Sequence, residues 1–205
     1  MKIGFAIITE DSFVSQIVAL EHEFHEKACF YDTLGVKNNI PHTTIFQGEM
    51  KNNINYLEIA DFIANEYNKI IRSKHIHFTD VEYVSHGWYF LMCEKTKELS
   101  ALHNLVLDKV SPFIILPKDR LNRITENMPE VQRNAIRDYN YRYAGDAFCP
   151  HITIGRSSKQ NNIVLSKLNE AIKRLDLSPH VDKITVYKMG ANGTHENTLY
   201  EVKIP

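Results

Sequence analysis

Hydrophobic residues form two different patterns in the first third of the chain, a continuous run and a repeat of three to four residues. Residues 2–9 form a continuous apolar run, rich in Ile and Phe, of the length typical of a buried strand. From Asp11 or Ser12 to about Ala28 the apolar residues instead recur every three or four positions, which predicts an amphipathic helix. The clearest stripe of this kind covers residues 55–73 and predicts a second helix.

The rest of the chain continues this alternation. Residues 76–84 and 88–93 have the composition of strands, and the dipeptide His86-Gly87 between them predicts a turn. The pattern also predicts helices at residues 96–110 and 162–175, and strands at residues 113–116, 183–189 and 199–204. Residues 117–148 are the least regular part, although Pro129 favours a short helix to about Asp138.

One five-residue pattern occurs twice. Pro41-His42-Thr43-Thr44-Ile45 returns as Pro150-His151-Ile152-Thr153-Ile154. In an extended strand, residues two apart project on the same face, so each copy is expected to place an imidazole beside a threonine hydroxyl. Two such pairs facing one cleft would surround a single anion with two histidines and two hydroxyl groups.

The shorter pattern His-x-Thr carries little information by itself. The chain contains 10 histidines, and about one chance occurrence is expected. A third example, His77-Phe78-Thr79, lacks both the proline and the isoleucine, and we interpret it as an ordinary strand segment. An isolated strand histidine is usually structural, but the repeated Pro-His-x-Thr-Ile context favours catalysis for His42 and His151.

The order of predicted elements also repeats. A motif strand, a helix and a pair of strands follow His42, and the same series follows His151. This repetition predicts two related lobes, each contributing one motif to a shared cleft. No linker rich in Gly, Ser or Pro separates the lobes, so residues 1–205 are expected to pack as one compact domain.

Composition narrows the class of protein. With 43% hydrophobic and 24% charged residues among 205, the chain resembles globular proteins, and its formal net charge of −1 provides no general attraction to nucleic acid or membrane. Cys29, Cys93 and Cys149 are odd in number and lack CxxC spacing, which favours a reducing compartment. No apolar run suits a signal peptide or approaches the ~18 residues of a membrane span, so we predict a cytoplasmic protein.

The two motifs resemble those of the 2H phosphoesterases, a family that includes the bacterial 2'-5' RNA ligases and cyclic phosphodiesterases. That family is defined by two His-x-Thr/Ser-x motifs with apolar flanks. The second copy, from Phe148 to Arg156, looks very much like the family's second motif, including the arginine. The first copy is similar but has the polar Gln47 where an apolar residue is commoner. The strand Trp88-Tyr89-Phe90-Leu91 also fits the family pattern.

The resemblance implies a bilobal α+β fold. In such a fold two antiparallel β-sheets form a central groove, helices pack outside, and the lobes are related by a pseudo-twofold axis. It also implies a reaction without a metal or other cofactor. The family covers cyclic phosphates, 2'-5' linkages and other phosphodiesters, so the substrate stays open. Residues 117–148 are longer than the corresponding stretch of compact members and form an inserted segment, a candidate flap over the groove.

These residue types suit the cleavage of a phosphodiester. Two histidines can act as base and acid because imidazole titrates near neutral pH. Thr44 and Thr153 can donate hydrogen bonds to the non-bridging oxygens, and Arg156 can add a charge-assisted bond. Strand alternation alone sets Arg156 on the face away from His151 unless the strand has ended.

The inserted segment combines five arginines with Tyr139, Tyr141 and Tyr143. Tyr141 and Tyr143 are candidates for stacking on a base, and arginines can bind phosphate. Six positive and five negative side chains nearly cancel there, so the segment is no basic patch. A substrate lid and a solvated flap with some tyrosines packed inward are both compatible with this composition.

The leading hypothesis is therefore a metal-independent phosphodiesterase acting as a monomer, without an obligate protein partner, on a nucleotide, cyclic phosphate or short oligonucleotide. One alternative is a non-catalytic nucleotide or RNA-binding module with the same groove. Another is a metal-dependent hydrolase. Its nearest motif, His22-Glu23-Phe24-His25, does not have the HExxH spacing, and the pair His75 and His77 lacks nearby ligands before Asp80.

Overall fold

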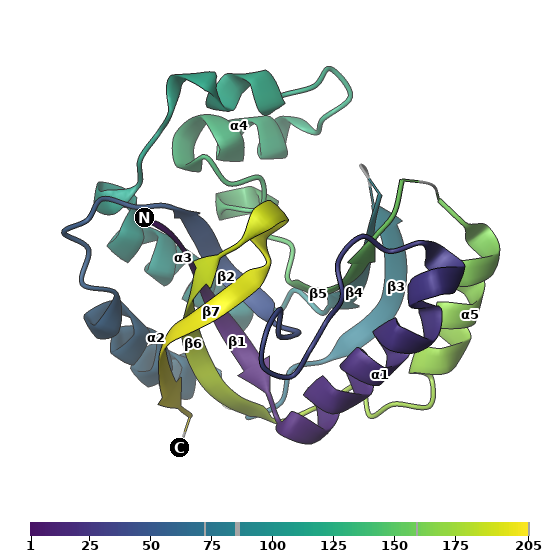
Figure 1. The fold of residues 1–205 in the computed structure, drawn as a ribbon. Coiled ribbons are helices and arrows are strands. Elements are labelled where there is room, and N and C mark those ends of the chain that lie inside the picture. The colour runs from purple at the N-terminus through teal and green to yellow at the C-terminus, as the bar shows by residue number, and fades with distance from the viewer. Residues whose placement is uncertain (72, 85–86, 159, 205) are drawn as a thin grey trace.

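The structure, a computed structural model, describes residues 1–71, 73–84, 87–158 and 160–204 (Figure 1). Its strands are β1 (Lys2–Thr9), β2 (Thr43–Glu49), β3 (Phe78–Val84), β4 (Trp88–Cys93), β5 (His151–Arg156), β6 (Val181–Met189) and β7 (His195–Lys203). Its α-helices are α1 (Asp11–Ala28), α2 (Tyr56–Ile70), α3 (Lys97–Val110), α4 (Glu130–Tyr139) and α5 (Asn162–Ile172). The 3-10 helices are η1 (Ser111–Phe113), η2 (Lys118–Arg123), η3 (Gly145–Ala147) and η4 (Ala191–Gly193).

The strands form one seven-stranded antiparallel sheet in the order β3-β4-β5-β2-β1-β6-β7. The expectation of two separate sheets is therefore wrong, because the two motif strands β2 and β5 pair at Thr43 and Ile152. If this register is extended by two residues in each direction, Pro41 lies across from Ile154 and Pro150 lies across from Ile45. Proline has no N–H to donate, which explains why this central pairing is so short.

The predicted repeat is present in the topology. Exchanging β1 with β4, β2 with β5 and β3 with β6 gives the order of those six strands in reverse, as a pseudo-twofold axis between β2 and β5 requires. Each half nevertheless contains strands from both parts of the chain. After β2 the chain crosses to β3 and β4 beside β5, and after β5 it crosses to β6 and β7 beside β1.

Helices cover both halves of the sheet on the outside, as expected (Figure 1). The pair α2 and α3 packs on β2, β6 and β7, whereas α1 and α5 pack on β3 and β5. The predicted stripe of α1 is buried, including Phe13, Ile17 and Phe24. Its N-cap is Glu10, without a side-chain capping bond, rather than Asp11 or Ser12.

Two predicted elements differ in the structure, one in its bounds and one in its conformation. The helix predicted at residues 55–73 is α2, which begins after Asn55, whose side chain caps it by accepting from the Glu58 N–H at 3.3 Å. The strand predicted at residues 113–116 is wrong. Pro112 favours the 3-10 turn η1 instead, and only an isolated bridge joins Ile114 to Met50. His86 of the predicted turn lies outside the described residues.

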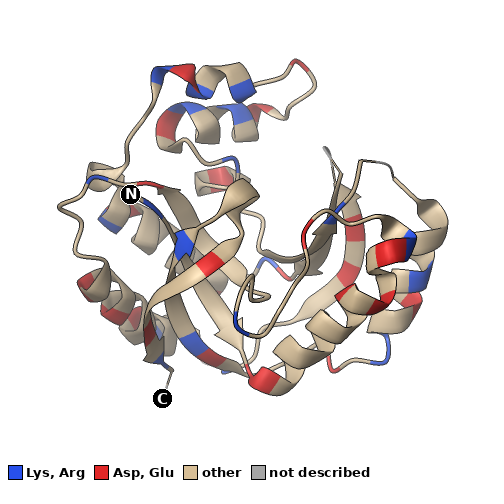
Figure 2. Cartoon of the chain, in the orientation of Figure 1, with Lys and Arg blue, Asp and Glu red and all other residues tan. Residues whose placement is uncertain are grey.

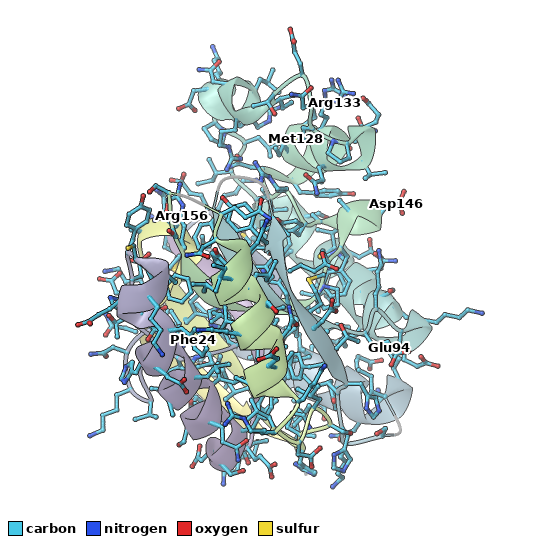
Figure 3. All side chains as sticks on the ribbon, turned by 90° about the vertical axis from the view of Figure 1, so that its right-hand side faces the viewer. Phe24, Glu94, Met128, Arg133, Asp146 and Arg156 are labelled. Carbon is cyan, nitrogen blue, oxygen red and sulfur yellow. The ribbon has the colours of Figure 1, made fainter. Side chains whose placement is uncertain are left out.

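The inserted segment consists of η2, α4 and η3 and stands beside β2 and α3 (Figure 1). The helix predicted from Pro129 is α4, with Pro129 as its N-cap. The segment has a small apolar interior of its own, since Met128 and Ile136 are buried. Figure 3 shows Met128 between the helices of the segment. Charges of both signs alternate along it (Figure 2), and Glu130 pairs with two of its arginines. It therefore has no single-sign surface.

The three cysteines are free thiols. Within the described ranges, no helix has both the length and the hydrophobicity required to cross a lipid bilayer. The cytoplasmic location and the monomeric state stay predictions from the sequence.

Candidate active site

The two motifs meet at the centre of the sheet. Thr43 pairs with Ile152, and in an antiparallel register the neighbouring positions set His42 across from Thr153 and Thr44 across from His151. Opposite residues of such a pair lie roughly 4.5–5.5 Å apart. Thr43 and Ile152 are each 1% exposed and point to the covered face. Each imidazole is therefore a cross-strand neighbour of the other motif's hydroxyl.

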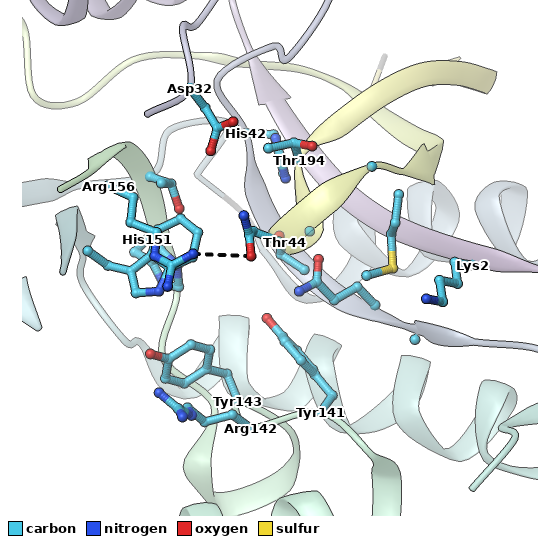
Figure 4. Close-up of a pocket in the computed structure, with 18 of the residues that line it drawn as sticks. Lys2, Asp32, His42, Thr44, Tyr141, Arg142, Tyr143, His151, Arg156 and Thr194 are labelled. Atoms are coloured by element: carbon cyan, nitrogen blue, oxygen red, sulfur yellow. Dashed lines mark hydrogen bonds between the residues drawn. The ribbon is translucent and has the colours of Figure 1, made fainter. Parts of the chain in front are cut away.

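All seven residues predicted for the site line one cavity of about 960 Å³ (Figure 4). They are His42, Thr44, Tyr141, Tyr143, His151, Thr153 and Arg156. The cavity has the size typical of a pocket for a small ligand. The expectation that the imidazoles share one space with room for an anion agrees with this geometry.

Both motif histidines are held in the same way. His42 Nδ1 lies 2.7 Å from the Ile40 carbonyl oxygen, and His151 Nδ1 lies 2.7 Å from the Cys149 carbonyl oxygen. A carbonyl oxygen only accepts, so Nδ1 carries the hydrogen in each ring. The lone pair of each neutral imidazole is therefore on Nε2, where it can accept a proton.

The two imidazoles differ in what packs against them. The Phe90 ring stacks on His151 with centroids 3.6 Å apart, and Tyr143 lies edge-on at 5.4 Å. His42 instead contacts two polar rings, Tyr187 at 4.8 Å and His195 at 5.7 Å. The two halves of the site therefore surround their imidazoles with different rings.

Burial makes both imidazoles weaker bases than free histidine. Desolvation lowers the pKa of His151 to about 4, with a smaller contribution from the nearby His42. Desolvation also lowers the pKa of His42, opposed in part by its bond to the Ile40 carbonyl. Both rings are therefore neutral at pH 7 in the free protein.

Arg156 faces the cavity because β5 contains a bulge. Phe90 pairs with Thr153 and Tyr89 pairs with Gly155, so Ile154 has no opposite residue. One extra residue reverses the alternation that follows it. The expectation from parity, that Arg156 points away from His151, is thereby corrected: Gly155 faces the helices, and Arg156 lines the cavity.

The Arg156 side chain is held from two sides. Its guanidinium lies 5.0 Å above the Trp88 ring, and its Nη1 donates to Asn192 Oδ1 at 3.3 Å (Figure 4). Trp88 comes from β4 and Asn192 from η4. Elements far apart in the chain therefore fix this cation beside the histidine pair.

The two tyrosines of the inserted segment pack as well as line the cavity. Tyr141 is 8% exposed and meets Phe46 and Tyr143 edge-on at 5.7 and 6.0 Å. Tyr143 contacts both Phe90 and His151. Burial raises the pKa of each phenol, so both stay neutral at neutral pH. Tyr143 thus covers one side of His151, whereas stacking of either tyrosine on a base stays a prediction.

His103 joins the inserted segment to the first motif strand. Its Nδ1 donates to the Ile45 carbonyl oxygen at 2.7 Å, and its Nε2 accepts from the Gly145 N–H at 2.9 Å. The fully buried ring stacks on Phe148 with centroids 4.1 Å apart. One neutral imidazole therefore satisfies the carbonyl of a motif residue and an amide of η3.

Comparison with known proteins identifies the fold. No protein-family model matches the chain, and no curated protein matches it in sequence. Among solved structures, apo E. coli LigT matches with a TM-score of 0.54 and 13% identity over 98% of this chain and 96% of that one. E. coli LigT with 3'-AMP gives a TM-score of 0.53 at 14% identity, covering 99% and 97%. LigT with phosphate gives 0.52 at 13% identity, covering 99% and 96%.

The chain has the LigT fold. At this level of identity the likeness concerns the fold alone. It covers nearly the whole of both chains, so the inserted segment does not place this protein outside the LigT-like architecture.

Four residues that line or support the cavity of this LigT-like fold were not predicted as site residues from the sequence. They are Gln47, Trp88, Tyr187 and Asn192. Gln47 could have been found by aligning the two repeats, since it and Arg156 each stand five residues after the motif histidine. Asn192 and Tyr187 reach the site only through folding of the last strands. No local sequence signal points to either.

Three of the histidines considered for a metal site lie outside the cavity and have other contacts. His25 Nδ1 lies 2.5 Å from the buried Glu21 carboxylate, and His22 Nε2 lies 3.1 Å from the Leu34 carbonyl oxygen. His75 Nδ1 contacts the Ser178 carbonyl oxygen at 2.7 Å. No group of three His, Cys, Asp or Glu side chains suited to a metal ion occurs in the part of the chain that the structure describes.

Proposed function

We propose that this protein is a metal-independent phosphodiesterase of the 2H phosphoesterase class that acts on a nucleotide substrate. The observation that carries the proposal is the cross-strand arrangement of His42, Thr44, His151 and Thr153 on the open face of the central strand pair. E. coli LigT, which shares the fold, has been solved with phosphate and with 3'-AMP. Those ligands support a nucleotide phosphate as the group that enters this cavity.

The proposed reaction divides proton transfer between the two imidazoles. Nε2 of one neutral ring accepts the proton of the attacking water or hydroxyl group, and Nε2 of the other ring, once protonated, donates to the leaving oxygen. A bound phosphate is an anion and stabilises the imidazolium beside it, so substrate binding supplies the acid that the free protein lacks at pH 7.

The hydroxyl groups and the arginine stabilise charge on phosphorus. Thr44 and Thr153 donate to the non-bridging oxygens, and Arg156 adds a charge-assisted hydrogen bond. Phe90 and Tyr143 exclude water from one side of His151. Candidate substrates are 2',3'-cyclic phosphates and 2'-5' or cyclic oligonucleotides, and reversible transfer to a ribose hydroxyl would use the same groups.

The decisive experiment is an activity panel with EDTA-treated protein. It compares 2',3'-cyclic nucleotides, 3'-5' and 2'-5' dinucleotides and cyclic oligonucleotides, each with the wild type and the variants His42→Ala and His151→Ala. We expect turnover of at least one class that survives chelation. Each substitution should lower kcat/KM by about 10²–10⁴-fold, the usual contribution of one general acid or base.

His77→Ala is the matched control, because His77 belongs to the third His-x-Thr sequence and is exposed immediately before β3. It should leave turnover unchanged. Activity that disappears with EDTA and returns with a divalent cation would instead favour the metal-dependent alternative. Binding of 3'-AMP without turnover of any diester would favour a non-catalytic nucleotide-binding module.

A further inference from the structure

The first motif strand contains the same irregularity as the second. Ala6 pairs with Thr44 and Phe5 pairs with Phe46, so Ile45 has no opposite residue. Ile45 and Ile154 are equivalent in the repeat, and each bulge reverses the alternation beyond it. Gln47 is therefore the structural counterpart of Arg156, and both line the cavity.

The Gln47 amide is held in a defined orientation. Its Oε1 accepts from the Tyr187 hydroxyl at 3.0 Å. Tyr187 is fully buried, and a side-chain carbon at Gly4 would come within 2.2 Å of its ring, so Gly4 provides the space for this tyrosine. On the other side, a side-chain carbon at Gly193 would lie 2.8 Å from Gln47 Nε2. The amide is thus confined between a tyrosine hydroxyl and a glycine.

This contact leaves the amide NH₂ available to a ligand. Over residues 1–71, 73–84, 87–158 and 160–204, Gln47 Nε2 has no hydrogen-bond acceptor. Gln47 is only half-buried and stands at the cavity wall. A neutral donor in this position therefore has a hydrogen bond to offer that the protein itself does not use.

The two halves of the site consequently present different charges. The half with His151 presents the Arg156 cation, and the half with His42 presents the neutral Gln47 amide. Two other arginines along the cavity, Arg120 and Arg123, donate to backbone carbonyls of the inserted segment. A third, Arg142, lies beside Tyr143, on the side of His151 (Figure 4). Lys2 also lines the cavity, and Glu49, the residue opposite it in the β1–β2 register, lines the cavity too and carries the opposite charge.

This asymmetry matches the charge of a phosphodiester. A diester carries one negative charge, whereas a phosphomonoester carries about −1.5 to −2 at pH 7. We infer that Gln47 is a specificity-determining residue that hydrogen-bonds the bound phosphate group and, being neutral, favours the monoanionic diester over the dianionic monoester. The inference rests on the proposed function. In that reaction Gln47 would weaken binding of the monoester product and so help its release.

The test compares Gln47→Arg and Gln47→Leu with the wild type. Gln47→Arg makes the halves alike in charge, so we expect 3'-AMP to bind at least 10-fold more tightly by calorimetry, with a gain of 3-fold or less for a 2'-5' dinucleotide. Gln47→Leu removes the donor and should raise KM for the dinucleotide about 5- to 10-fold, while kcat changes less than 3-fold. Gln160→Leu, the same change at an exposed site outside the cavity, should alter neither.

The calorimetric measurement of 3'-AMP affinity does not depend on turnover. The proposed function and the proposed role of Gln47 can therefore fail separately. If the wild type cleaves no diester but Gln47→Arg strengthens 3'-AMP binding selectively, the proposed function falls and the charge preference stands. Equal effects of Gln47→Arg on monoester and diester would overturn the inference. An unchanged affinity for 3'-AMP would overturn it too, and so would 3'-AMP binding to neither protein. Thermal unfolding of each variant checks that the fold is retained.

Discussion

Ile45 and Ile154 occupy equivalent positions in the two halves of the molecule, and at each of them the motif strand contains one residue more than its partner strand. The bulge has a functional consequence in both places. It turns the residue two positions later, Gln47 or Arg156, onto the face of the motif histidine. A strand without the bulge would present only the imidazole and the hydroxyl group.

The threonine hydroxyl groups are expected to act in the transition state. Thr44→Val and Thr153→Val keep the shape of the side chain and remove the donor, so each should lower kcat by about 10²–10³-fold. Steady-state kinetics on the best diester of the panel measures this. Thr43→Val is the control from the same motif, because Thr43 is buried on the opposite face and its hydroxyl has no partner among the described residues. Its activity should be unchanged. A loss below 5-fold in both test variants would contradict the assigned role.

The maximum of kcat/KM as a function of pH is expected to lie below pH 7. The kcat/KM profile reports the free enzyme, in which burial lowers the pKa of His151 to about 4 and that of His42 below 6.5. Falling pH protonates the base, and rising pH removes the proton of the acid, so the expected curve is a bell with its maximum between about pH 4 and 6.5. The two limbs belong to the coupled pair rather than to single residues. A maximum above pH 8 would be incompatible with this burial.

His103 is expected to stabilise the fold without taking part in chemistry. His103→Ala leaves the Ile45 carbonyl and the Gly145 amide without their partner, which should cost about 2–4 kcal/mol in the free energy of unfolding. Denaturant unfolding at pH 7 measures the loss, with His77→Ala as the exposed control.

The same residue predicts a pH dependence of stability. Burial lowers the pKa of His103 from 6.5 to about 4, so the unfolded chain takes up the proton first as the pH falls. Its contribution is intact above pH 6.5 and is lost progressively towards pH 4, by on the order of 3 kcal/mol in total. His151 and His195, which are buried, and His42, which is partly buried, also have lowered pKa values and add losses of the same sign. Wild-type stability that does not fall between pH 6.5 and 4 would contradict this.

Position 155 is expected to tolerate no side chain larger than that of glycine without a shift of its neighbours. A side-chain carbon there would lie 2.5–2.7 Å from three atoms of the Phe30 ring, which is itself buried. Gly155→Ala should therefore destabilise the protein by about 1–3 kcal/mol. It should also raise KM, because the strand that carries Arg156 must shift. Adding Phe30→Leu should recover part of the stability, and a fully additive double variant would argue against the clash.

The inserted segment is expected to affect larger substrates more than small ones. Residues 118–139 can be replaced by a short Gly-Ser linker because the ends are close: Arg120 Nε donates to the Arg137 carbonyl oxygen at 3.0 Å. Since η2 supplies part of the cavity wall, the replacement should raise KM at least 5-fold for a dinucleotide and less for a cyclic mononucleotide. Unchanged KM values for both substrates would identify the segment as a solvated flap.

The alternation of side chains along a strand was sufficient to predict the arrangement of residues at the centre of the site. Because strand side chains alternate, His42 with Thr44 and His151 with Thr153 could be placed on one face, with Thr43 and Ile152 on the other. The same rule failed for Arg156, because a bulge depends on pairing with a neighbouring strand and leaves no mark in local sequence. The prediction of two sheets failed for a related reason, since it required knowing whether β2 and β5 pair.

The sequence by itself determined the periodic elements and two equivalent pairs of imidazole and hydroxyl, because both follow from the spacing of residues within single segments. The tertiary structure decided everything that depends on partners distant in the chain. It set the two pairs across from each other, turned Arg156 and Gln47 inward, and enclosed His151 between Phe90 and Tyr143. Burial by residues distant in the chain also lowers the pKa of both His42 and His151.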